Sequence, residues 1–249
     1  MNAVILAAGV GKRLRPFTTE HPKCLLTFGG KSLLRRHVEM LDGAGMKTIC
    51  VVVGHLADQV EAELKQLICR TPIELVYNAE YRFGSALSLL QAEAALRTAA
   101  IIMDADLLFC RTMVDRLVAS PAADCLLVDD RLVDSGEEVK VVSRSDGRVY
   151  QLGKQVRREG TVIGESVGIY KFSAETTHDL IEALRRAVRE NPHVEYETVI
   201  DSLLEHIPMR YVPVGDLPWI EIDFPQDVDR ARNEIWPYIA SRQTAPFVS

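Results

Sequence analysis

The stretch LAAGVGKRLRPFTTEHPKCLL, residues 6–26, decides the fold of this chain. It continues the apolar run AVILA (3–7), which ends close to a glycine, as a buried parallel strand does. Gly9 and Gly11 follow, where a backbone without side chains can approach a ligand closely. The cations that come next are Lys12, Arg13, Arg15 and Lys23. Glycine-lined backbone amides beside fixed cations suit a polyphosphate, so the stretch predicts a phosphate-binding loop.

Two standard phosphate-binding motifs do not fit this loop. The dinucleotide fingerprint needs a third glycine where the chain has Leu14, and the P-loop needs Gly-Lys-Ser/Thr where it has Gly11-Lys12-Arg13. Taken alone, the glycines and cations are equally compatible with a basic surface turn after a strand.

Outward from this loop, the chain alternates strands and helices. Apolar runs predict a buried strand at 49–53 and further strands at 73–77 and 99–103. Apolar residues at helical spacing predict helices from Ser32 to about Asp42, from Leu56 to Ile68 and from Ser85 to about Arg97. In the second helix, one buried face is expected to hold Val60, Leu64, Leu67 and Ile68. This alternation implies right-handed crossovers and a mainly parallel sheet.

After Asp106 the pattern changes to strands separated by short turns, at 124–130, 139–144, 147–153 and 162–172. This part is expected to be more antiparallel and to cover one side of a cleft. Helices return at 173–189, 196–205 and 227–239. The prediction is an α/β fold with a mixed, mainly parallel central sheet flanked by helices and an antiparallel extension. It forms one domain over residues 1–241, with a tail at 242–249.

Composition excludes several classes of protein. The 249 residues carry a formal net charge of −6, which gives no electrostatic reason to expect a nucleic-acid partner. No apolar run reaches the ~20 residues of a transmembrane helix, and the opening MNAVILAAG makes a poor signal peptide, so no membrane partner is expected. Five cysteines stand singly, as structural thiols do, which favours a reducing, cytoplasmic setting.

The longer string LAAGVGKRLRPFTTEHPK closely resembles the signature of the nucleotidyltransferases that make sugar nucleotides and CDP-alcohols. In that family Leu-Ala-Ala-Gly-x-Gly-x-Arg-Leu and Pro-Lys recur at this separation. The resemblance implies a Rossmann-like domain that joins a nucleoside triphosphate to a phosphorylated acceptor and releases pyrophosphate. It implies backbone contacts to the nucleotide from Leu6, Ala7, Ala8, Gly9, Val10 and Gly11. Two catalytic cations are implied, Arg13 on the triphosphate and Lys23 beside the α-phosphate.

The resemblance continues along nearly the whole chain. It adds Asn78, Gly84 and Ser85 to the nucleotide site and implies Lys154, Glu165, Gly168, Glu197 and Trp219 at the acceptor site. It implies Mg²⁺ as cofactor, held by Asp106, Glu221 and Asp223. The nucleotide-binding part is then about 1–110, the acceptor-binding part about 111–224 and the C-terminal helix 225–241. An ordinary turn at Asp106, a helix cap at Asp223 and an exposed strand lysine at Lys154 are the simpler alternatives.

Several segments bear on the branch of the family. Glu137-Glu138-Val139-Lys140-Val141 and Gly153-Lys154 look most like cytidylyltransferases that act on phosphocholine, phosphonates or inositol phosphate, so CTP is favoured. A hexose-1-phosphate thymidylyl-, uridylyl- or guanylyltransferase is the alternative, although Gly84-Ser85-Ala86 departs from the usual Gly-Thr-Ala. A nucleotide-binding regulator without turnover is the second alternative. A homo-oligomer is also possible.

Two geometric expectations concern the carboxylates. Because side chains alternate along a strand, only one of Asp104 and Asp106 is expected to face the cleft, with Asp106 favoured. The strands ending near Met103 and Ile222 are expected to be neighbours in the parallel sheet, which would bring Asp106 to Asp223. The histidines show no ligand spacing, and His37 and His178 are expected at the surface or its boundary.

Overall fold

A single mixed sheet organises the chain, for which the computed structural model describes residues 1–244. Within these residues nine strands form the sheet, with β10-β9-β11-β6-β1-β4-β5 in line; β8 also pairs with β11, and β12 pairs with β8. The strands are β1 (Asn2–Ala7), β4 (Ile49–Val53), β5 (Ile73–Tyr77), β6 (Ala100–Asp104), β8 (Cys125–Asp129), β9 (Lys140–Ser143), β10 (Val149–Gly153), β11 (Thr161–Phe172) and β12 (Arg210–Pro213). The pairs β1–β4, β1–β6 and β4–β5 are parallel, while β11 runs antiparallel to β6, β8 and β9. The predicted Rossmann-like fold is confirmed.

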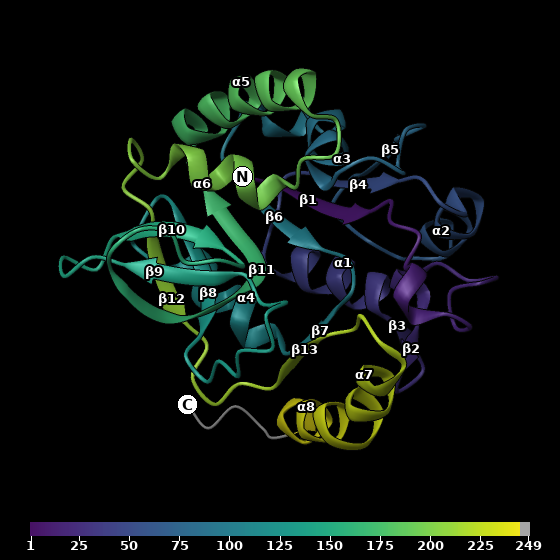
Figure 1. Ribbon diagram of the computed structural model, residues 1–249. Helices are drawn as coiled ribbons and strands as arrows, with labels where there is room; N and C mark the ends of the chain where they lie inside the picture. Colours follow the sequence, from purple (N-terminus) through teal and green to yellow (C-terminus); the bar gives the residue numbers. More distant parts are fainter. Residues whose placement is uncertain (245–249) are drawn as a thin grey trace.

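Helices cover both faces of the sheet because the side chains of the central strands alternate between two cores. One core takes Ala3 and Ile5 of β1 and packs against α1 (Leu33–Gly43), α2 (Ala57–Lys65) and α4 (Arg111–Ala119). The other takes Val4 and packs against α3 (Ser85–Gln91), α5 (Ala174–Glu190) and α6 (Tyr196–Leu203), which gather at the top of Figure 1. The last helices, α7 (Pro225–Arg230) and α8 (Trp236–Thr244), lie at the bottom.

Further short segments occur within residues 1–244. They are the ribbon β2–β3 (Thr27–Phe28 and Lys31–Ser32), three 3-10 helices at Lys12–Leu14, Lys23–Leu25 and Ala95–Arg97, and a π-helix at Ala231–Ile235. The predicted helix after Leu56 is shorter than expected. It ends at Lys65, so Ile68 lies beyond it and is fully exposed, and its place on the buried face was wrong. The predicted tail falls partly in α8 and otherwise, at 245–249, outside the described residues.

The two acidic segments lie together in a second two-stranded ribbon, not on neighbouring strands of the parallel sheet as expected. β13 (Trp219–Glu221) does not join the sheet as a parallel neighbour of β6; it pairs antiparallel with β7 (Leu107–Phe109), with Glu221 opposite Leu107. The pattern also does not predict β7 or α4. The chain turns after Asp104, and three apolar residues are too few to reveal a strand by periodicity.

Candidate active site

A cavity of ≈ 1460 Å³ opens at the C-terminal ends of β1 and β6. This is the edge of an open α/β sheet where ligands bind. The loop after β1 forms one wall, and β10, β11 and α6 form the facing wall. The predicted nucleotide-contacting segment lies in the first wall, where the cavity is lined by Leu6, Ala7, Ala8, Gly9, Val10 and Gly11.

The glycine loop presents unused backbone donors. Within residues 1–244 the amides of Gly9, Val10 and Gly11 donate to no protein acceptor. Gly11 has a φ of 61°, which favours glycine, and its carbonyl accepts a 2.6 Å hydrogen bond from the Thr18 hydroxyl. The hydrogen bond from Thr18 therefore fixes the loop, while the backbone N–H groups of the loop stay available for an anion.

Both predicted catalytic cations contact the acidic cluster, which consists of Asp106, Glu221 and Asp223. Lys23 Nζ lies 2.7 Å from Asp106 Oδ2 and 2.6 Å from Asp223 Oδ1. Arg13 lies 2.5 Å from the other oxygen of Asp223 and 3.3 Å from Glu137. One ligand oxygen from each of Asp106, Glu221 and Asp223 falls within 4.8 Å of the others, so the three can reach one ion.

The ribbon β7–β13 brings these carboxylates together. The Ile222 amide donates to the Asp106 carbonyl over 3.1 Å, directly between the two acidic segments. Asp227 accepts from the amides of Asp223 and Phe224 at 3.1 and 2.8 Å, so Asp227 makes the helix cap that was the alternative role for Asp223. The side chain of Asp223 is thereby left to face the cavity.

Electrostatics at the cluster favour a bound cation. Desolvation inside the cavity, with Asp106 and Asp223 nearby, raises the pKa of Glu221 to about 8, although part of this residue is exposed to solvent. Burial alone would lower the pKa of Lys23, but Asp106, Asp223 and Glu221 outweigh it and hold that pKa above its usual value. Asp106 Oδ1 is buried and has no hydrogen-bond partner among the described residues. An all-oxygen donor set with an unsatisfied buried oxygen fits Mg²⁺.

Asp104 also lines the cavity, so the expectation that only one of Asp104 and Asp106 faces it was wrong. Residues two positions apart on a strand point to the same face, so alternation does not separate Asp104 from Asp106, and the strand itself ends at Asp104. Tyr196 donates a 2.6 Å hydrogen bond to Asp104 from the facing wall. Burial raises the pKa of the neighbouring Glu197 to about 7, against the effect of a hydrogen bond to its own backbone.

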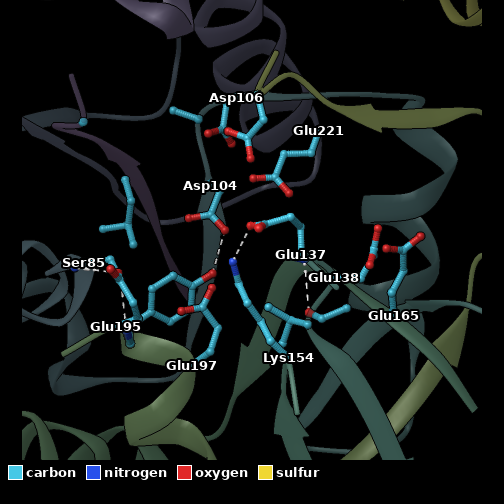
Figure 2. A pocket seen from close by; sticks show the side chains of 18 of the residues that line it. Ser85, Asp104, Asp106, Glu137, Glu138, Lys154, Glu165, Glu195, Glu197 and Glu221 are labelled. Atoms are coloured by element: carbon cyan, nitrogen blue, oxygen red, sulfur yellow. Dashed lines mark hydrogen bonds and ion pairs between the residues drawn. The ribbon is translucent and has the colours of Figure 1, made fainter. Parts of the chain in front are cut away.

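The five predicted acceptor-site residues all line the cavity: Lys154, Glu165, Gly168, Glu197 and Trp219. Lys154 lies 2.8 Å from Glu137, the same carboxylate that pairs with Arg13, so Glu137 bridges the two walls (Figure 2). Trp219 donates to Asp129 over 2.6 Å. The bridging Glu137 was not among the predicted residues, although its segment was noted.

Two predicted nucleotide-site residues lie outside the cavity wall. Asn78 is buried; its amide donates to the Ser88 hydroxyl over 3.0 Å, and its carbonyl oxygen accepts from the Glu80 backbone over 2.9 Å. Gly84 faces the backbone of Val194, where a Cβ would collide. Asn78 and Gly84 therefore serve the turn before α3, and Ser85, which contacts Glu195, represents this segment in the cavity.

None of the six histidines lines the cavity. His37 is 1% exposed, which contradicts its expected place at the surface; its apolar neighbours at helical spacing were the signal for burial.

Among residues 1–244 no helix is long and apolar enough to span a bilayer.

Comparison with known proteins agrees with this geometry. The profile of the MobA-like NTP transferase domain matches residues 3–132. CTP:phosphoglutamine cytidylyltransferase of Campylobacter jejuni is 27% identical over 92% of this chain and 98% of that protein. A bifunctional IPC transferase and DIPP synthase of Aquifex aeolicus is 26% identical over 92% of this chain, which spans only 50% of that longer protein. The inositol-1-phosphate CTP transferase of T. maritima shares the fold, with a TM-score of 0.77 at 19% identity over 98% of this chain and 96% of that one. The chain belongs to the family of MobA-like NTP transferase domains, which confirms the nucleotidyltransferase resemblance of its opening loop.

Proposed function

We propose that this chain is a Mg²⁺-dependent cytidylyltransferase that joins CTP to a phosphorylated small alcohol or phosphonate and releases pyrophosphate. One observation carries the proposal: the unused amides of the glycine loop, the Lys23 ammonium and three convergent carboxylates line the same cavity. The relatives that match this chain over 92% of its length include a cytidylyltransferase, which supports CTP as the donor.

The reaction needs positioning and charge neutralisation more than proton transfer. A phosphomonoester has a second pKa near ~6, so its attacking oxygen is already anionic at pH 7. This accounts for a cavity without a histidine base. The loop amides of Gly9–Gly11 hold the phosphates, Arg13 binds the leaving pyrophosphate, and Lys23 stabilises the charge that develops at the α-phosphate.

Asp106, Glu221 and Asp223 would hold the Mg²⁺. When bound, the ion neutralises phosphate charge and orients the triphosphate. Lys23 provides the compensating charge between Asp106 and Asp223 in the present structure.

The acceptor lies against the wall formed by β10, β11 and α6, where Lys154 contacts its phosphate. Glu165 and Glu197 of that wall surround the rest, and Trp219 lines the same cavity from β13. In this proposal the nucleotide-binding part is about 1–110 and the acceptor-binding part about 111–224. The five free cysteines support a cytoplasmic setting.

Pyrophosphate release with CTP, UTP, dTTP and GTP, each against phosphocholine, 2-aminoethylphosphonate, inositol phosphate and hexose 1-phosphates, tests the proposal. Cytosine carries an amino donor where uracil carries an acceptor, and an unpaired buried polar group costs ~1–3 kcal/mol. CTP is therefore expected to exceed UTP and dTTP about 10–100-fold in kcat/KM. Preferred turnover of dTTP, UTP or GTP with a hexose 1-phosphate would assign the alternative enzyme class. Nucleotide binding without pyrophosphate release would assign a regulator.

A further inference from the structure

His37 touches the ribbon that carries the acidic cluster. It lies on α1, with its Nε2 2.8 Å from the Leu107 carbonyl oxygen and its ring stacked on Phe109 at 5.1 Å. Leu107 directly follows Asp106 in the chain and stands opposite Glu221 in the β7–β13 ribbon. The hydrogen bond of His37 therefore ends between two of the three carboxylates of the proposed metal site.

The imidazole ring of His37 acts as a hydrogen-bond donor. A carbonyl oxygen can only accept, so Nε2 carries the proton, and burial lowers the pKa of His37 to about 4, which keeps the ring neutral at pH 7. Its Nδ1 is buried and has no hydrogen-bond partner among the described residues. An apolar side chain would fill this place without that desolvation cost, so packing alone does not explain a histidine here.

The ribbon needs such an anchor. β7 and β13 have three residues each and lie outside the nine-stranded sheet. A two-stranded ribbon is marginally stable by itself, and its placement depends on contacts with its surroundings. The Ile222–Asp106 backbone bond closes the ribbon on itself, while His37 ties it to α1.

We propose that His37 is a positioning residue of the metal site: its hydrogen bond to Leu107 holds the β7–β13 ribbon so that Asp106, Glu221 and Asp223 converge on one cation. This inference rests on the proposed function for the identity of that cation. The loss of an outer partner of a metal site typically weakens metal affinity 10–100-fold.

The test compares three substitutions at one position. His37→Phe keeps the ring without the donor, His37→Gln places an amide near the position of Nε2, and His37→Asn places its amide too far from Leu107. Val38→Ala is the matched control, since Val38 is a buried core residue of α1 whose side chain can neither donate nor accept a hydrogen bond. Two quantities are measured on the full chain: Mn²⁺ affinity by electron paramagnetic resonance, and amide hydrogen exchange of segments 105–109 and 219–223 without metal.

His37→Phe and His37→Asn are expected to bind Mn²⁺ about tenfold more weakly and to exchange faster in both segments. His37→Gln is expected to stay within about threefold of wild type, and Val38→Ala to change neither quantity locally. Wild-type exchange in His37→Phe, equal behaviour of the Gln and Asn variants, or an equal effect of Val38→Ala would overturn the inference. The Gln and Asn pair decides it if the Phe variant does not fold. A wild-type protein that binds no Mn²⁺ contradicts the metal site of the proposed function, whereas the exchange data still decide the role of His37.

Discussion

The Lys23 ammonium donates to the Asp223 carboxylate over 2.6 Å, although the two residues stand 200 positions apart. The same ammonium contacts Asp106, 83 positions away, over 2.7 Å. One cation from the glycine-loop segment therefore meets the acidic ends of two distant segments. Lys23 therefore brings the glycine-loop segment together with both carboxylates at the cavity.

Lys23→Ala is expected to lower kcat at least ~10²-fold, because a preorganised charge is lost where the α-phosphate gains negative charge. Steady-state kinetics of pyrophosphate release measure this. Lys47→Ala, at an exposed lysine that does not line the cavity, is the control. An unchanged kcat with a raised KM for the triphosphate would show that Lys23 only binds substrate.

Asp106→Asn and Asp223→Asn are each expected to abolish turnover, by more than ~10²-fold, while the thermal unfolding temperature stays near that of wild type. Each change removes a charged oxygen ligand without altering the shape of the side chain. Pyrophosphate release and thermal unfolding are measured together, with the exposed Asp229→Asn on α7 as control. Near-full activity of either variant at limiting Mg²⁺ would remove that residue from the metal site.

Glu165→Gln is expected to stabilise the protein at pH 8 relative to wild type, with little difference at pH 4. Burial, with Asp129 and Glu138 nearby, raises the pKa of Glu165 to about 7 from its ordinary value of 4.5. Between those two values the folded state retains a proton that the unfolded state has lost, so this group lowers stability as pH rises through the window and adds no further loss above it.

Thermal unfolding at pH 4, 6 and 8 measures the effect of Glu165→Gln. Glu190→Gln, at the exposed end of α5, should show no such trend. If the difference between Glu165→Gln and wild type is the same at all three pH values, the pKa of Glu165 is not raised by its surroundings.

Gly168→Ala is expected to destabilise the fold by at least ~1 kcal/mol, because Gly168 has a φ of 79° that costs about 1–2 kcal/mol for a residue with a Cβ. The new Cβ would also stand 2.7 Å from Asp104 Oδ2. Urea unfolding measures the change. Gly9→Ala, where an added Cβ meets nothing within 4 Å, should leave stability unchanged, and equal stability of both variants would contradict the strain at Gly168.

Local patterns predicted most of the fold. The apolar run before the glycine loop became β1, and the runs at 49–53 and 73–77 became β4 and β5 with those bounds. β1 and β4 were predictable because burial on a parallel sheet requires continuous apolar side chains. β5 is instead an edge strand with Leu75 and Tyr77 exposed, and its apolar and aromatic residues were the signal for a strand. β7 and the true end of α2 were not, since three residues carry no period and helix ends depend on capping contacts.

The candidate site was likewise predictable from the sequence only in part. The sequence by itself determined the chemistry: a glycine loop without side chains, cations beside it, and carboxylates at the ends of apolar segments, because residue type and spacing are local properties. Only the tertiary structure decided the arrangement. In the folded chain, Asn78 is buried and hydrogen-bonds Ser88. Asp104 lines the cavity together with Asp106. His37 is buried and hydrogen-bonds the Leu107 carbonyl, which directly follows Asp106. Contacts across 83 and 200 positions depend on how the sheet and its short ribbon pack, which no local pattern encodes.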